Sequence, residues 1–180
     1  QISEGVDLNV EFGLDFNVPW LESGLRYDAI FRGTQMLTQT EEEFLATGIN
    51  IDDDLGEYGN PEYRASLTHI LGFQDWRFLW QTRYISSFIE DNDDPEDTTT
   101  SFFNPCIQAG DGPCVILEDS PEYWVHDMSV SYAYDTWAVR AGVNNVLDEA
   151  PFVQTNVNSV RGSGYDLNGR TFFVNVSKQF

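Results

Sequence analysis

An uninterrupted alternation of apolar and polar residues near the start of the chain is the feature that most constrains its fold. From Val6 to Val18, every even position is apolar and every odd position is polar or glycine. A two-residue period predicts a β-strand with one apolar and one polar face. This stretch is longer than the usual soluble strand of about five or six residues. It is instead long enough for the roughly nine to eleven residues that cross a bilayer at a tilt.

Six further segments show the same alternation and predict six further strands, at residues 25–39, 61–71, 76–88, 123–134, 136–147 and 169–180. The connections between the strands alternate in length: 19–24, 72–74 and 135 are short, whereas 41–60, 90–122 and 148–168 are long. Outer-membrane barrels have short periplasmic turns and longer extracellular loops. The pattern therefore predicts an all-β, antiparallel transmembrane β-barrel wall, with the long loops extracellular and the C-terminus periplasmic.

The predicted number of strands suggests that this wall belongs to something larger. Seven is an odd number, and bacterial single-chain barrels have even numbers of strands. An open sheet edge in lipid leaves backbone groups unsatisfied, which is costly. The sequence after Gln1 has no basic and then apolar leader, so we expect a mature protein, a processed piece or the tail of a longer chain. No run of about eighteen apolar residues predicts a membrane-spanning helix.

The end of the chain carries a recognisable signature. It consists of Gly142-Val-Asn-Asn-Val-Leu-Asp-Glu-Ala-Pro151, Tyr165-Asp166 and Gly169-Arg-Thr-Phe-Phe-Val174. This signature resembles the C-terminal end of TonB-dependent outer-membrane receptors, whose last two strands are joined through a motif of the form G-V-N-N-L-F-D-x-x-P. Val146 and Leu147 stand where that family usually has Leu and Phe, and Lys178 stands where an aromatic residue is common.

The resemblance implies more than the strand pattern does. Residues 1–180 would be the last seven strands of a barrel of the 22-stranded type, with the earlier strands and the plug domain preceding them. Phe180 would be the signal that the outer-membrane assembly machinery reads. The implied function is TonB-dependent uptake of a scarce large solute, most often a ferric siderophore and sometimes a cobalamin or an oligosaccharide. The implied partners are the rest of the barrel, the plug, the TonB complex through the missing N-terminal part, outer-membrane lipid and the extracellular solute.

The charge of the chain excludes one class of partner. Nine Lys and Arg residues stand against thirty Asp and Glu residues, a formal net charge of -21. Such a chain repels the phosphate backbone, so no nucleic-acid partner is expected. Hydrophobic residues make up 41% of the chain and aromatic residues 14%, which is not the composition of a disordered acidic segment.

The arginines are the candidate substrate-facing residues. Each alternates with apolar neighbours and so belongs to the polar face of its strand, because an arginine facing lipid at the midplane costs about 2–4 kcal/mol. In the lumen, their common role is to pair with carboxylates such as Asp28, Asp127 and those of a plug. The alternative role is to bind an anionic substrate. The six arginines are Arg26, Arg32, Arg64, Arg77, Arg83 and Arg140.

Other candidate sites are fewer. Cys106 and Cys114 flank a short loop rich in Pro and Gly, which favours a disulfide over a metal site, because no C-x-x-C occurs and neither His69 nor His126 is near in sequence. The acidic runs at 52–54 and 91–97 are better explained as solvated loops than as Ca²⁺ sites, because the glycine of an EF-hand turn is absent.

No catalytic arrangement is evident. No Ser-His-Asp or Cys-His order and no phosphate-binding loop occur, so we expect no enzyme, no cofactor and no metal. The two histidines are predicted to be interface or lipid-side residues.

Two other classes of protein fit parts of the sequence. A passive porin-like channel needs the same strands but no plug. A secreted acidic β-sandwich that acts as a binding module also has alternating strands, but it predicts that one set of apolar side chains lies in a dry core. That set is Leu8, Phe12, Phe16, Trp76, Phe78 and Trp80.

Overall fold

The computed structural model describes residues 1–19, 24–45, 48–57, 59–88, 120–151, 165 and 167–179. It contains β1 (Ile2–Phe16), β2 (Leu25–Leu45), β3 (Gly48–Asp53), β4 (Tyr63–Phe73), β5 (Trp76–Ile85), β6 (Tyr123–Tyr134), β7 (Trp137–Asn144) and β8 (Thr171–Lys178). Among the described residues there is no helix long and apolar enough to span a membrane.

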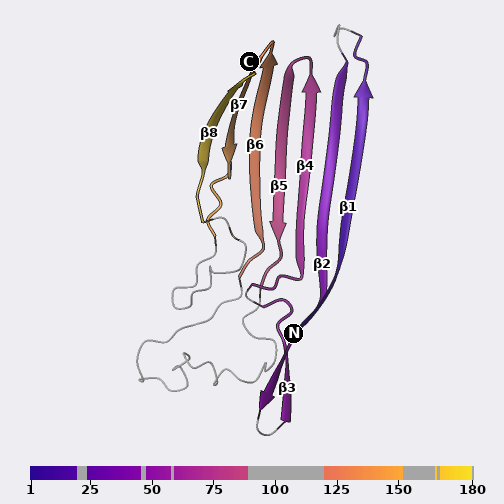
Figure 1. Cartoon of the computed structure of the whole chain (residues 1–180), viewed down its shortest axis with the longest axis vertical. Helices are drawn as coiled ribbons and strands as arrows, with labels where there is room; N and C mark the ends of the chain where they lie inside the picture. Colours follow the sequence, from indigo (N-terminus) through magenta and orange to yellow (C-terminus); the bar gives the residue numbers. More distant parts are fainter. Residues whose placement is uncertain are drawn as a thin grey trace.

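The strands form one antiparallel sheet. Its order is β1-β2-β4-β5-β6-β7-β8, and β3 pairs only with the far end of β2. Figure 1 shows the seven long strands side by side, with the tight β4–β5 and β6–β7 turns at one end. The prediction of a seven-stranded antiparallel wall is confirmed. Within the described residues β1 and β8 do not pair with each other, so the sheet is open.

The predicted loop at 41–60 was wrong. β2 runs to Leu45 and turns back into β3, with Thr40 opposite Asp53 and Leu45 opposite Gly48. The sequence hides this hairpin because the region carries consecutive acidic residues, Glu41–Glu43 and Asp52–Asp54, which are typical of a solvated loop. β2 also has a β-bulge: the register shifts between Glu4 and Gly5 of β1, which face Thr38 and Met36 of β2. The extra residue in β2 is therefore Leu37. Because of this extra residue, the side chains of β2 on the apolar face of the sheet are at odd positions before Leu37 and at even positions after it. The two-residue alternation of β2 is therefore interrupted there.

Several predicted strand ends also differ from the structure. The turn after β4 is Gln74-Asp75 rather than 72–74, and Gln74 has a φ of 51°. β7 ends at Asn144 and β8 spans Thr171–Lys178, so both are shorter than predicted. β5 ends at Ile85, and Phe88 does not continue its apolar face. Phe88 instead bridges to Ser120 and is fully buried.

The cross-strand register gathers the apolar positions on one face. One row across the sheet is Val10, Phe31, Leu67, Thr82 and His126, and the neighbouring row is Phe12, Ala29, His69, Trp80, Met128 and Val143. No second layer covers this face within the described residues. The six side chains that a sandwich would bury are between 40% and 55% exposed. The β-sandwich alternative is therefore wrong for the described part of the chain.

Aromatic side chains mark both ends of this apolar face. Near the tight turns, the rings of Trp76 and Tyr132 lie 4.6 Å apart, and the Lys178 amine lies 4.8 Å from the ring of Trp137. Toward the other end, the rings of Tyr84 and Trp124 lie 4.5 Å apart. Trp76 and Tyr84 are separated by about 26 Å along β5 at roughly 3.3 Å per residue. This is similar to the lipid-facing band of outer-membrane barrels, about 25 Å tall between aromatic girdles.

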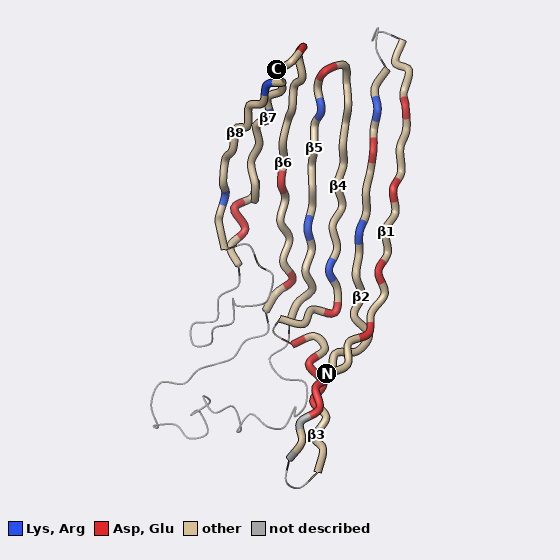
Figure 2. Tube along the Cα trace, in the orientation of Figure 1, with Lys and Arg blue, Asp and Glu red and all other residues tan. Residues whose placement is uncertain are grey.

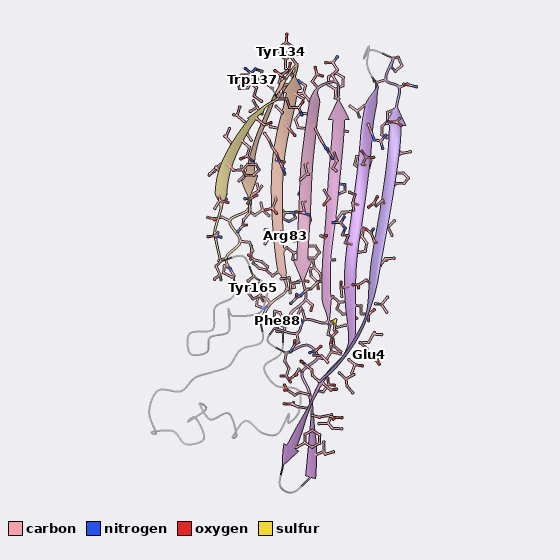
Figure 3. The ribbon with its side chains drawn as sticks, in the orientation of Figure 1. Glu4, Arg83, Phe88, Tyr134, Trp137 and Tyr165 are labelled. Atoms are coloured by element: carbon pink, nitrogen blue, oxygen red, sulfur yellow. The ribbon has the colours of Figure 1, made fainter. Side chains whose placement is uncertain are left out.

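A small core lies on the polar face at the end opposite the tight turns. Phe88, Tyr123, Val125 and Tyr165 are its buried members, and Ile85 packs against it. The ring of Tyr165 lies 4.7 Å from that of Tyr123 and 5.9 Å from that of Phe88. Figure 3 shows Phe88 and Tyr165 at this end, and Tyr134 and Trp137 at the other. The core therefore joins Tyr165 to β6 and to the end of β5.

Candidate substrate-facing surface

The polar face carries all six predicted arginines, in two groups. Arg26, Arg77 and Arg140 belong to a single row near the tight turns, in which Gly72 and Ser131 lie between them; we call these three the arginine row. The other three are nearer the opposite end of the sheet. Arg32 and Arg83 both lie opposite Ser66 of β4, on either side of it, and Arg64 is two residues before Ser66 on the same face of β4. We call Arg32, Arg64 and Arg83 the arginine trio. Figure 2 shows how the basic residues are spread over the strands.

Arg26 pairs with two carboxylates on the polar face of the sheet, Asp28 and Asp15. It donates to both oxygens of Asp28 at 2.9–3.1 Å and lies 3.9 Å from Asp15. Gly13 leaves room for this pair, because a Cβ there would be 2.9 Å from Asp28 Oδ1. The predicted pairing with Asp28 is confirmed. Arg26 is well exposed, so the pair contributes little to stability in water.

Arg83 makes a more enclosed ion pair. Its Nε and Nη2 each lie 3.2 Å from Asp127 Oδ2. The Asp127 side chain is only 15% exposed, and its other oxygen, Oδ1, accepts a hydrogen bond from the backbone N–H of Asn145 at 2.8 Å. This confirms the predicted pairing with Asp127. It also links the arginine trio to the turn that follows β7, because one carboxylate serves both.

Asn145 organises that turn. It is fully buried and has a φ of 53°, a conformation that Asn adopts more readily than most residues. Its side-chain amide donates to the Glu149 carbonyl, and its side-chain oxygen accepts from the Glu149 N–H, both at 2.8 Å. Asp148 then accepts a hydrogen bond from the Arg170 N–H at 2.7 Å. The sequence identified this signature only by resemblance; the structure assigns it a role in joining β7 to β8.

Among the described residues, Arg140 contacts a hydroxyl group and an aromatic ring rather than a carboxylate. Its Nη2 donates to Ser129 Oγ at 3.1 Å, and its guanidinium lies 5.5 Å from the centre of the Phe173 ring. The Phe173 ring fills the space over Gly142, where a Cβ would be only 2.5 Å from Phe173 Cζ. Arg140 and Phe173 therefore pack as one unit across β6, β7 and β8.

A groove of about 580 Å³ crosses the polar face and is lined by the arginine trio. Asp7, Asn9 and Thr34 lie at its β1 and β2 side. Thr34 donates to Asp7 at 2.6 Å, and Arg64 donates to the Gly59 carbonyl at 3.3 Å. Within the described residues, the Arg32 side chain has no ion-pair partner. Arg77, in the arginine row, lies outside this groove and lines a smaller one with Glu11 and Asp28.

The two histidines lie on the apolar face, as predicted. Nδ1 of His69 lies 2.6 Å from the hydroxyl of Tyr27, and Nδ1 of His126 lies 3.0 Å from the hydroxyl of Thr82. Each ring therefore has a hydrogen-bond partner on its own face. In the part of the chain that the structure describes, no group of His, Cys, Asp or Glu is placed to hold a metal ion. Cys106, Cys114, Phe180 and the acidic run at 91–97 lie outside the described residues.

An antiparallel sheet with a lipid-sized apolar face, aromatic ends and a polar, arginine-bearing reverse face defines the wall of a membrane β-barrel. The model of a protein family, the TonB-dependent receptor-like β-barrel, matches residues 1–146. The chain therefore belongs to the TonB-dependent receptor β-barrel family, whose members are outer-membrane transport receptors rather than enzymes. No curated protein and no solved structure matches the chain.

The family match and the sequence signature cover different parts of the chain. The match ends at Val146, whereas the signature begins at Gly142 and continues to the last strand. The two observations are therefore largely independent. Membership of a TonB-dependent family implies outer-membrane transport coupled to TonB and a plug domain, and the family that matches is not that of the passive porins.

Proposed function

We propose that this chain supplies barrel wall and extracellular loops to an outer-membrane receptor that takes up a large anionic solute, a ferric siderophore. The observation that carries the proposal is the groove lined by Arg32, Arg64 and Arg83 on the polar face. Guanidinium groups match carboxylate and other oxyanion edges with paired hydrogen bonds, which makes a cluster of them selective for anionic ligands.

The members of the trio have different roles. Arg83 is committed to Asp127 and keeps the wall and the β7–β8 turn in place. Arg32 and Arg64 have no ion pair with a described residue and bind the anionic edge of the solute as it passes. The arginine row near the tight turns has a structural role in the barrel wall, because Arg26 already pairs with Asp28 and Arg140 with Ser129.

We propose an orientation of the wall that gives the solute the same route. With the tight turns in the periplasm and the long connections outside the cell, an incoming solute meets the arginine trio before the arginine row. The regions 41–60, 90–122 and 148–168 then approach the solute, and the C-terminus is periplasmic. The alternation of short and long connections and the aromatic ends of the apolar face support this orientation.

Residues 1–180 are proposed to be the C-terminal portion of a larger barrel around a plug. The edges of β1 and β8 have no partner within the described residues, and lipid tolerates no open edge. Strands of the rest of the receptor pair with them. Energy enters through the TonB complex, which contacts the plug part of the same receptor. Cys106 and Cys114 form a disulfide in the external loop, and Phe180 is read during assembly.

The test uses the complete receptor in cells starved of iron. The double variant R32Q/R64Q is compared with R77Q, a matched control on the same face but outside the groove. Uptake of radioactive iron as its ferric siderophore is measured over a range of concentrations. We expect the half-saturating concentration to rise by roughly tenfold or more in the double variant, because two charged hydrogen-bond donors are lost. R77Q behaves as the wild type.

Two results would contradict the proposal. Uptake of ferric siderophores that is the same in R32Q/R64Q and wild type would remove the arginines from the solute path. A second contradicting result would be that R32Q/R64Q binds the solute as the wild type does but lets large antibiotics leak through the barrel. This would show that the two arginines pair with carboxylates of the plug and hold it in place. Heat-modifiable migration of each variant in gels serves as the check that the barrel has assembled.

A further inference from the structure

The hairpin formed by the end of β2 and by β3 lies beyond the membrane. Gln35 is the last residue of β2 that pairs with β4, opposite Tyr63. Phe44 is nine residues further on, which is about 30 Å along an extended strand. A bilayer adds only about 5–8 Å of headgroup region on each side of its core. Figure 1 shows β3 projecting past the ends of β4 and β5.

This hairpin carries an apolar patch in water. Its members, Phe44, Ile49 and Ile51, are 76%, 60% and 62% exposed. The register places them on one face, because Phe44 is opposite Ile49, and Ile51 is opposite Glu42, two residues from Phe44. Lipid does not reach this far, so the membrane does not explain the patch. Clustered apolar side chains rimmed by polar ones mark an interaction surface.

The surroundings of the patch define the charge of the partner. From Gly33 to Tyr63 the chain has eight Asp and Glu residues and no Lys or Arg. Glu42 is exposed on the same face of β2 as the patch, and Glu41 is exposed on the opposite face. Figure 2 shows acidic residues along this projecting part of the chain. A second copy of the chain would bring the same acidic hairpin and a net charge of -21, so repulsion opposes self-association.

We propose that this hairpin is a docking site for a partner protein segment that carries both basic and apolar side chains. The apolar side chains of the segment cover Phe44, Ile49 and Ile51, and its Lys or Arg residues face Glu42 on the same face. Charge attraction speeds the encounter, and the apolar contact holds the complex. This surface lies outside the arginine groove and does not depend on the substrate assigned to it.

The test uses the full receptor in nanodiscs of zwitterionic lipid and three synthetic probe peptides. One peptide alternates Lys and Leu, the second alternates Lys and Ser, and the third alternates Glu and Leu. Binding is measured by fluorescence anisotropy, with empty nanodiscs subtracted. We expect only the Lys/Leu peptide to bind well. Its affinity should fall by roughly tenfold or more in the variant F44S/I49S/I51S, as expected when the centre of a contact is removed.

A control is Leu167→Ser, which removes an exposed apolar side chain that lies outside the patch. The affinity of the Leu167→Ser receptor for the Lys/Leu peptide should equal that of the wild-type receptor. The variant E41Q/E42Q and a rise in salt should each weaken binding several-fold, because the charge contribution is screened or removed. These substitutions lie on an exposed hairpin, so the barrel itself should assemble normally, as heat-modifiable migration will show.

Three outcomes would overturn the proposal. Equal affinity of the Lys/Leu and Lys/Ser peptides, or of wild type and F44S/I49S/I51S, would show general acidic attraction only. Self-association of the receptor that disappears in F44S/I49S/I51S would assign the patch to a second copy. Patch-dependent binding of lipopolysaccharide vesicles with Ca²⁺, without peptide binding, would assign it to lipid.

Discussion

On the apolar face of the sheet most side chains of a row are apolar, whereas on the polar face several charged side chains have one particular partner. Phe12, Trp80 and Val143 share a row with no specific polar contact required between them. Across the sheet, Asp127 serves both Arg83 and the backbone of Asn145. The lipid face thus depends mainly on the apolar character of its side chains, while the ion pairs of the lumen face depend on the register. Substitutions on the two faces should therefore fail in different ways.

The largest effect is expected where a charge is moved to the lipid face. Leu67 lies on the apolar face between Phe31 and Thr82, and the adjacent Thr68 lies on the polar face. Leu67→Arg should destabilise the barrel by about 2–4 kcal/mol in lipid, because arginine must enter the hydrocarbon. Thr68→Arg should have a much smaller effect. Equilibrium unfolding in lipid vesicles measures both, and equal losses in the two variants would refute the assignment of faces.

The next largest effect compares how much the Arg83–Asp127 and Arg26–Asp28 ion pairs contribute to the free energy of unfolding. Asp127→Asn removes the charge that faces Arg83 and weakens the anchor of the Asn145 turn, so we expect a loss of about 1–3 kcal/mol. Asp28→Asn breaks the exposed pair with Arg26 and should change the unfolding free energy by no more than the error of the measurement. The same unfolding assay compares them. A larger loss for Asp28→Asn would show that the Arg83–Asp127 link is not the organising contact.

A glycine on the polar face gives a third comparison. A Cβ at Gly142 would lie 2.5 Å from Phe173 and 2.6 Å from the Met128 carbonyl, whereas one at Gly72 would have its nearest neighbour at 3.8 Å. Gly142→Ala should therefore cost about 1–3 kcal/mol through overpacking. Gly72→Ala should be close to neutral. Unfolding midpoints for the two variants provide the test, and equal midpoints would show that Phe173 does not fix the spacing of β7 and β8.

The smallest effect concerns pH and the core around Tyr165. Burial raises the pKa of Tyr165 above its usual value, although its hydrogen bond to Ser120 opposes this. Because the pKa of Tyr165 is higher in the folded state, its contribution to stability is fully present below the pKa of about 10 in the unfolded chain. This contribution is lost as the pH rises through the pKa of the folded state. Tyr165→Phe cannot ionise, so it should keep its protection from protease above pH 10 better than wild type. Identical alkaline profiles would exclude this contribution.

The sequence predicts what depends on side-chain character and misses what depends on register. Alternation was enough to assign Arg26 and Arg83 to the polar face and to name Asp28 and Asp127 among the carboxylates available to its arginines. Which arginine pairs with which carboxylate became clear only from the structure. The β2–β3 hairpin was missed because Glu41–Glu43 and Asp52–Asp54 are typical of a solvated acidic loop, and only the register shows that these runs belong to two paired strands. The role of Asn145 was missed because its contacts reach Asp127, which is eighteen residues away in sequence. Such contacts appear only once the strands are in register.

The central claim is that one face of this sheet meets lipid and the other meets water. Spin labels placed one at a time along β5, from Trp76 to Ile85, test it in the receptor reconstituted in lipid, with Cys106 and Cys114 replaced by Ser. We expect oxygen accessibility to peak at even positions and accessibility to a water-soluble nickel complex to peak at odd positions. Accessibility without a two-residue period, or with the two phases exchanged, would contradict the account.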